Sequence, residues 1–161
     1  MPRGGPMKRF RVILLGLALM VLSTAARAVS CNVSATSVAF GSYNIFNASP
    51  LDATGAVTVH CTNLVNLFVS YDIKLSTGLS GSYAARQMAN GANPFNYNLY
   101  TAATRLNVWG DGSAGTSFVS NGILVVLLGV TVNHTVYGRV PALQNVAVGS
   151  YSDNITVTLT F

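Results

Sequence analysis

The chain closes on the stretch Asn154-Ile155-Thr156-Val157-Thr158-Leu159-Thr160-Phe161. Apolar side chains alternate here with asparagine and threonine, and a period of two is typical of a β-strand. Such a strand buries one face and leaves the other in water. We therefore expect a terminal strand whose buried row is Ile155, Val157, Leu159 and Phe161.

Other stretches of the chain repeat this pattern less regularly. Leu67–Leu75 alternates in the same way, and Cys31–Phe40 changes phase near Ser37, which indicates a bulge or a strand that changes sheets. Further strands are expected at Ala56–Thr62, Phe95–Tyr100, Leu106–Trp109, Ile123–Leu128 and Val130–Tyr137. Breaks are expected at Asn47–Gly55, Gly78–Pro94, Gly110–Gly122 and Arg139–Ser152.

Ile123–Leu128 is continuously apolar, as in a strand covered on both faces, and we expect it to form a hairpin with Val130–Tyr137 through Gly129. Short strands separated by turns rich in glycine, asparagine and serine predict an all-β sandwich. The 161 residues suit a single domain, and no repeat or linker divides them.

The distribution of charged residues bears on whether the chain binds nucleic acid. Half of the residues are apolar, 8% are charged, and the formal net charge is +5. Five of the nine lysines and arginines lie in the first 28 residues, and from Val29 onward four basic residues face four aspartates and no glutamate. A neutral body argues against binding to nucleic acid, which needs clustered cations.

Few residues are candidates for catalysis or for metal binding. His60 and His134 lack the spacing of metal ligands, and Asp111 between two glycines is typical of a turn rather than a calcium loop. No set of nucleophile, base and acid can be argued from spacing. We expect a structural or binding protein that is not an enzyme and has no catalytic residues, no metal and no cofactor.

Residues 1–28 have the composition of a signal peptide. Lys8, Arg9 and Arg11 are followed by the apolar run Val12–Leu22, and Ala26-Arg27-Ala28 provides the small residues of a cleavage site. A membrane-spanning helix needs about 20 apolar residues, so a permanent membrane anchor is the weaker alternative. A lipid anchor on Cys31 is weaker still, and translation could start at Met7. We expect an exported domain at residues 29–161, located in the periplasm and then at the cell surface or outside the cell.

An exported chain would carry its two cysteines, Cys31 and Cys61, into an oxidising compartment. In an oxidising compartment a disulfide between them is the default. A reactive or metal-binding thiol is the alternative, and it would need a nearby histidine. His60 is adjacent to Cys61, but neighbours on a strand point to opposite faces. We therefore predict the bridge.

Short motifs resemble a known family. Phe40-Gly41-Ser42-Tyr43 resembles the FGxY element of the spore coat protein U family, whose members are similar to subunits of archaic chaperone–usher pili. More of the family pattern follows in order across the expected mature chain: Cys61-Thr62-Asn63, Tyr71–Leu75 with Gly78, Arg86-Gln87-Met88, Tyr97–Tyr100, Trp109-Gly110-Asp111-Gly112, Tyr137-Gly138 and Gly149-Ser150-Tyr151-Ser152-Asp153.

The resemblance implies an immunoglobulin-like sandwich that lacks one strand. A periplasmic chaperone would fill the resulting groove first, and a neighbouring pilin-like subunit would replace it at an outer-membrane usher. The terminal strand is expected to fit this arrangement, because nothing in the sequence follows it to pair with its far edge. An unpaired apolar edge invites a foreign strand. We expect the acceptor edge at Ile155, Val157, Leu159 and Phe161.

One feature departs from the family pattern. After the expected cleavage only Val29 and Ser30 precede Cys31, a reach of roughly 7 Å, which is too short for a donor strand. The chain would then be a tip or terminal subunit, or a coat protein that does not polymerise by donation, or it is cleaved earlier. The alternative function is a self-contained coat or adhesive protein that binds a surface or glycan through Tyr97, Tyr100 and Trp109, unless these aromatics are core residues.

Overall fold

The computed structural model describes residues 29–62, 66–126 and 128–161, and the predicted signal peptide lies outside these ranges. The described chain forms eight strands, one short 3₁₀ helix and no α-helix. In order these elements are β1 (Ser30–Thr36), β2 (Leu51–Thr62), β3 (Leu67–Leu75), η1 (Gly78–Ser80), β4 (Arg86–Asn90), β5 (Asn93–Tyr100), β6 (Val119–Val125), β7 (Val130–Val140) and β8 (Val157–Thr160).

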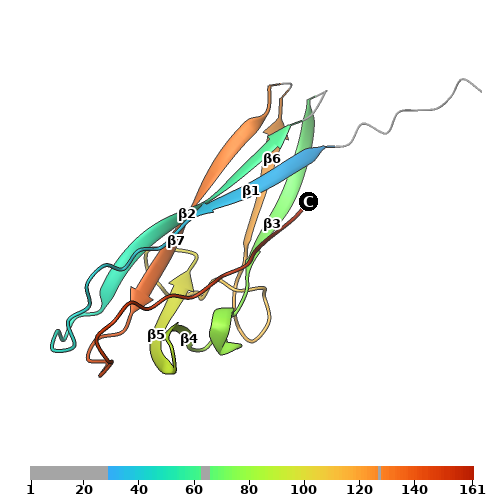
Figure 1. Cartoon of the computed structure of the whole chain (residues 1–161). Coiled ribbons are helices and arrows are strands. Elements are labelled where there is room, and N and C mark those ends of the chain that lie inside the picture. The colour runs from blue at the N-terminus through green and yellow to red at the C-terminus, as the bar shows by residue number, and fades with distance from the viewer. Residues whose placement is uncertain (1–28, 63–65, 127) are drawn as a thin grey trace, which may run out of the picture.

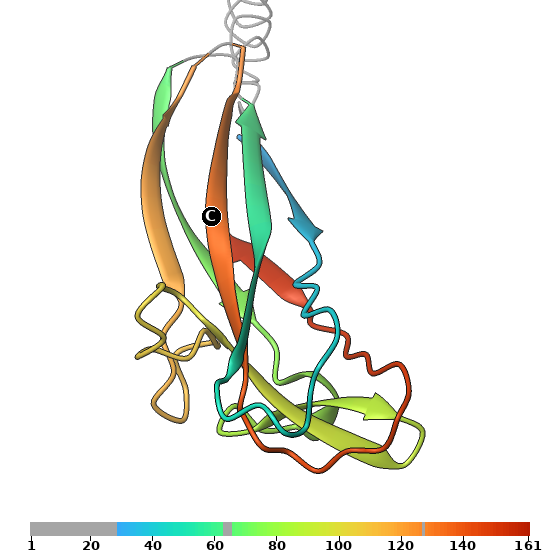
Figure 2. The same cartoon turned by 90° about the vertical axis from the view of Figure 1, so that its left-hand side faces the viewer.

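The strands form two antiparallel sheets, which confirms the prediction of an all-β, immunoglobulin-like sandwich. The larger sheet has the order β1-β2-β7-β5-β4 and the smaller one the order β6-β3-β8. The long strands β2 and β7 run side by side through most of the molecule (Figure 1), and the view turned by 90° shows the two layers (Figure 2).

The core lies between the two sheets. Inward side chains alternate along each strand because successive residues of a strand point to opposite faces. The largest fully buried side chain is Trp109, and it belongs to the loop between β5 and β6. The apolar strand residues that are fully buried are Val57, Val59, Cys61, Tyr71, Ile73, Val125 and Val140.

Several predicted strands match the structure and others need correction. Leu67–Leu75 has the predicted bounds, and β1 ends at Thr36, beside the predicted phase change at Ser37. β2 begins at Leu51 instead of Ala56, because its ladder with β7 continues to the pair Leu51↔Val140. The break predicted at Gly78–Pro94 contains β4, and Leu106–Trp109 makes only isolated bridges.

The hairpin predicted through Gly129 is wrong. β6 pairs with β3, whereas β7 pairs with β2 and β5, so the chain crosses from one sheet to the other between them. Full cover of Ile123–Leu128 is also wrong, since Leu124 is 57% and Leu128 91% exposed. β6 is the edge of the smaller sheet, and one of its faces meets solvent.

Cys31 and Cys61 lie directly opposite each other on β1 and β2 and are joined by a disulfide. A bridge that closes a loop of this length contributes about 3–4 kcal/mol in the chain-entropy model. It links β1, an edge strand, to its neighbour β2 in the larger sheet. Residues 29–62, 66–126 and 128–161 contain no helix with the length and apolarity of a membrane span.

Candidate functional site

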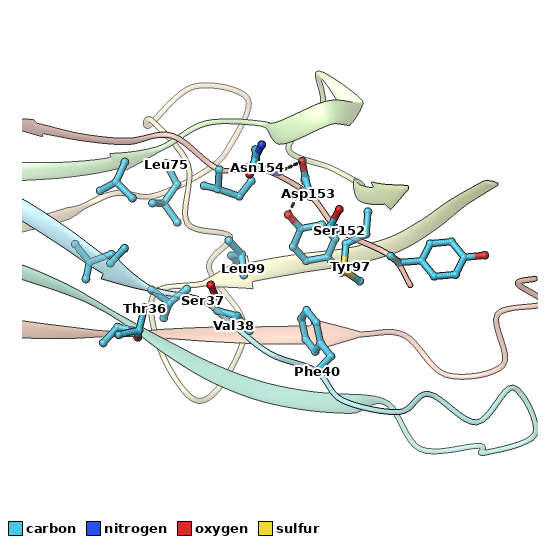
Figure 3. A pocket seen from close by; sticks show the side chains of 18 residues that line it. Thr36, Ser37, Val38, Phe40, Leu75, Tyr97, Leu99, Ser152, Asp153 and Asn154 are labelled. Carbon is cyan, nitrogen blue, oxygen red and sulfur yellow. Dashed lines mark hydrogen bonds between the residues drawn. The ribbon is translucent and has the colours of Figure 1, made fainter. Parts of the chain in front are cut away.

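An apolar groove of about 380 Å³ opens between the two sheets on the side where β1 and β8 lie. One wall is the segment that continues β1, residues 35–40, and the other is the segment that leads into β8, residues 151–157. Figure 3 shows the side chains of the two walls facing each other across the gap, with Leu99 and Tyr97 between them. The groove floor is formed by Val57, Leu75, Met88, Tyr97, Leu99 and Val136.

After Thr36 the first wall leaves its ladder with β2 and crosses the inner face of the larger sheet. Two glycines on that face leave space for it. A Cβ on Gly138 would lie 2.6 Å from Val38 Cγ1 and 2.8 Å from Phe40 Cζ. A Cβ on Gly55 would lie 2.7 Å from the carbonyl oxygen of Thr36. Any larger residue at either position would push this wall into the groove.

Hydrogen bonds to the Asp153 carboxylate hold the second wall in place. Its Oδ2 accepts a 2.7 Å hydrogen bond from the Tyr97 hydroxyl, and its Oδ1 accepts bonds from the backbone N–H groups of Leu79 and Asn154. Burial and then the bond to Asp153 raise the pKa of the Tyr97 phenol, so it stays a donor. Figure 3 shows Asp153 between Tyr97 and Asn154.

Backbone bonds also hold the second wall. Ser152 exchanges two hydrogen bonds with Ala89 of β4, at 2.9 and 3.2 Å. Four residues later Thr156 bonds to Ser76, which follows β3. The segment therefore passes from the edge of one sheet to the edge of the other.

The four residues of the predicted acceptor edge occupy different environments. Ile155 and Val157 are half-buried and line the groove. Leu159 is half-buried and packs against the core, whereas Phe161 lies past the end of β8 and is 56% exposed. The threonines between them are exposed. This apolar row is only partly covered by the described residues.

The outer edge of β8 has no strand partner within the described chain. β8 pairs with β3 alone, and β1 pairs with β2 alone. Cα atoms of β1 and β8 come within 8 Å of each other, yet no hydrogen-bonded ladder joins the two strands. The sandwich is thus open along this side.

A second hollow of about 560 Å³ continues the groove beyond Phe40 and Tyr151. Its walls are residues 38–45 and 146–151, and Phe95 forms part of its floor. The Tyr43 hydroxyl donates to the carbonyl of Pro141 and accepts from the N–H of Gln144, at 2.9 and 2.8 Å. Tyr43 thereby joins the first wall to the loop that precedes the second wall.

The motif residues predicted from the family pattern divide into two groups. Six of them line the groove or the second hollow: Phe40, Gly41, Tyr43, Tyr97, Tyr151 and Asp153. The other four form a turn elsewhere, where the Trp109 indole donates to the carbonyl of Ile73 and the carbonyl of Gly110 accepts from Leu75, while Asp111 and Gly112 are exposed. Tyr97 and Trp109 are core residues and leave only Tyr100 of the three predicted adhesive aromatics at the surface.

Arg86 is a buried residue whose role the sequence did not indicate. Its guanidinium donates to the carbonyls of Ser76 and Trp109 and to Asn98 Oδ1, at 2.6 to 3.1 Å, and stacks over Tyr83. The family pattern contained Arg86-Gln87-Met88 without showing that this arginine is fully buried. It joins the Trp109 turn to the strands that form the groove floor.

His134, on β7, is a titratable group that does not line the groove or the second hollow. Its Nε2 shares a 2.8 Å hydrogen bond with the Tyr71 hydroxyl, which also accepts from Asn121 Nδ2. Which of the two groups donates depends on the His134 tautomer, and burial lowers the pKa of His134.

This pKa shift predicts a pH dependence of stability. Below the ordinary histidine pKa of about 6.5 the unfolded chain binds a proton that the folded chain does not, so stability falls as the pH decreases. The loss should begin near that value and level off below the lower pKa of the folded state. Urea unfolding between pH 7.5 and 4.5 measures it. His134→Gln should remove this component, and the matched variant His60→Gln should leave it; equal profiles for wild type and His134→Gln would contradict the assignment.

Among the described residues, no three His, Cys, Asp or Glu side chains gather into a group that could hold a metal ion. The one carboxylate in the groove, Asp153, already accepts three hydrogen bonds. The groove has an apolar floor between walls that also carry the polar residues Thr36, Ser37, Ser152 and Asn154, a combination that suits an extended peptide.

Fold and groove together define the class, an immunoglobulin-like all-β protein whose sandwich is open along one side. The sequence adds the family. The model of the Spore Coat Protein U domain matches residues 17–158, and the chain belongs to this family. The match begins inside the predicted signal peptide. Protein U of Myxococcus xanthus is 35% identical over 131 residues, which cover 76% of this chain and 70% of that protein.

A solved structure is similar in fold. It is the crystal structure of the CsuC–CsuE chaperone–tip adhesion subunit pre-assembly complex from archaic chaperone–usher Csu pili of Acinetobacter baumannii. The alignment has a TM-score of 0.56 at 20% identity and covers 83% of this chain and 40% of that chain. This chain thus spans less than half of that chain's length, and the likeness is one of fold.

Proposed function

We propose that this protein is an exported structural subunit of a surface pilus or coat that accepts a β-strand from another protein. The observation that carries the proposal is the half-buried apolar row at and just before β8, where Ile155 and Val157 line the groove and no strand of the described chain pairs with the outer edge of β8. A strand added there would form a ladder with β8 and place alternate side chains on the floor.

The partners follow from the family and from the neighbouring fold. A periplasmic chaperone would fill the groove first, and a neighbouring pilin-like subunit would then replace it at an outer-membrane usher. Support comes from the membership in the Spore Coat Protein U domain family and from the likeness to a chain of a chaperone–subunit complex. The role is structural rather than enzymatic, and no nucleic acid takes part.

Within this proposal the chain occupies a tip or terminal position. A subunit that accepts a strand and is cleaved after Ala28 would have only Val29 and Ser30 ahead of Cys31. N-terminal sequencing of the exported protein tests this point. A mature chain that starts well before residue 20 would assign it an internal position.

A peptide added in trans tests strand acceptance. The probe is a twelve-residue peptide that alternates valine with threonine between flanking lysines, and the control has the same composition with the valines clustered. At a free peptide concentration of 100 times Kd, binding to the folded state alone should stabilise the exported chain by about 2.7 kcal/mol. Thermal unfolding measures the shift. A wild-type chain that is a stable monomer and responds equally to both peptides would contradict the proposal.

A further inference from the structure

A charged and aromatic cluster lies on the outer face of the larger sheet, away from the groove. Asp52 of β2 stands opposite Arg139 of β7, and two residues along β7 Tyr137 stands opposite Tyr100 of β5. Cross-strand partners share a face. Arg105, from the loop after β5, reaches over the same corner and lies 3.3 Å from Asp52 and 6.0 Å from the centre of the Tyr137 ring.

The two guanidinium groups are not saturated by their own chain. Arg139 uses Nε and Nη2 to bind both oxygens of Asp52, at 2.7 and 2.8 Å, and its Nη1 has no partner among the described residues. Arg105 donates through Nη1 to the carbonyl of Ala103, and its buried Nε pairs with Asp52 Oδ1 at 3.3 Å without forming a hydrogen bond within the described chain. Two cations share one carboxylate, so the cluster has one uncompensated positive charge.

Arg105 is held in an unusual backbone conformation. Its φ of 54° lies in the left-handed region, which a residue with a long side chain rarely adopts. Such strain persists where surrounding structure holds it, and it concentrates at functional sites. Here it directs the guanidinium over Tyr137 and next to Asp52.

The rest of this face is polar and uncharged. Outward-facing threonines, together with His60 of β2 and Asn133 of β7, continue from the cluster along these two strands, and some of them are linked in cross-strand pairs. Thr58 donates to Asn133 at 2.7 Å, and His60 and Thr131 are 2.8 Å apart. The face therefore offers hydroxyl and amide groups at the regular spacing of a sheet, beyond a cationic and aromatic corner.

We propose that this outer face binds an acidic polysaccharide, with the carboxylate of a uronic acid at Arg105 and Arg139 and its sugar ring against Tyr137. A planar guanidinium suits a carboxylate because it can donate two parallel hydrogen bonds. A tyrosine ring gives a broad amphipathic surface for the C–H face of a sugar, and the hydroxyl and amide rows suit the following sugars. The proposal is independent of strand acceptance, since it uses the opposite face of the sheet.

Three immobilised polymers separate the two contributions with the wild-type exported chain. Polygalacturonate provides both carboxylates and sugar rings, its fully methyl-esterified form keeps the rings without the charge, and polyglutamate keeps carboxylates without the rings. We expect at least tenfold tighter binding to polygalacturonate than to either control. No binding to polygalacturonate, or comparable binding to one of the controls, would overturn the proposal.

Variants locate the site. Arg105→Gln should weaken binding to polygalacturonate at least tenfold, whereas Lys74→Gln, which removes a cation from the smaller sheet, should leave it unchanged. Thermal unfolding of each variant checks that the fold is retained. Equal losses for the two variants would show attraction by overall charge and would overturn the assignment to this corner.

Discussion

Replacing Arg86 with leucine should lower the free energy of unfolding by about 3–5 kcal/mol. The substitution leaves the carbonyls of Ser76 and Trp109 without their side-chain donor and removes one of the two donors to Asn98 Oδ1, in a region where Arg86 is fully buried. Each buried acceptor that loses its partner costs about 1–3 kcal/mol. A loss of this size is a large part of the about 5–15 kcal/mol that stabilises a domain.

Urea unfolding measures this effect, and two further variants make it specific. Arg86→Lys keeps a positive charge but replaces the planar donor set with a single ammonium group, so it should recover only part of the stability. Gln87→Leu, at the next position, removes only the exposed bond to Asn96 and should change stability by less than about 0.5 kcal/mol. If Arg86→Leu lost no more than Gln87→Leu, the buried arginine would have no structural role.

Arg86 also shows a limit of prediction from the sequence. Arginine is a residue that proteins mostly expose, so a local pattern favours a surface position for it. Its acceptors come from the end of β3, from β5 and from the Trp109 turn, which are brought together only by the tertiary fold. β4 was missed for the same reason, because its buried position depends on these distant partners.

Alternation along the chain did predict the parts of the fold that local pattern controls. Leu67–Leu75 has the predicted bounds, and the phase change near Ser37 corresponds to the point where β1 leaves the larger sheet. Pairing was harder to predict. Ile123–Val125 and Val130–Val132 are adjacent in sequence and apolar, yet they belong to different sheets. In a sandwich the sheet that receives a strand is decided by contacts across the whole chain.

The sequence predicted one wall of the groove but not the opposite wall or the floor. The period-two row predicted a buried face at Ile155, Val157, Leu159 and Phe161; Ile155 and Val157 line the groove and Leu159 packs against the core, but β8 spans only Val157–Thr160 and Phe161 is 56% exposed. The opposite wall and the floor come from segments that are distant in sequence, among them Val38, Leu99 and Val136. The close approach of Val38 to Gly138 is a tertiary contact that a pattern of single residues does not encode.

The largest effect should come from giving the chain its own covering strand. An extension after Phe161 with an Asn-Gly turn and eight residues that alternate threonine and valine can fold back along β8, because Asn-Gly favours a two-residue hairpin. Each inward valine adds about 1.5–3 kcal/mol of apolar burial, and the ladder adds backbone hydrogen bonds along an edge that otherwise faces solvent. Even after the cost of ordering the extension, we expect the Tm to rise by about 10 °C or more.

Matched controls assign this gain to the groove. An extension of the same length with asparagine in place of valine should give little or no rise, because it can form a ladder but cannot cover the floor. In the valine version Val157→Asn should remove much of the gain, since Val157 is half-buried in the groove wall, whereas Thr158→Asn on the exposed face should preserve it. The difference between these variants with and without the extension gives the coupling between Val157 and the added strand, expected to be about 1–3 kcal/mol. A gain that Val157→Asn and Thr158→Asn reduced equally would mean that the extension stabilises the chain without entering the groove.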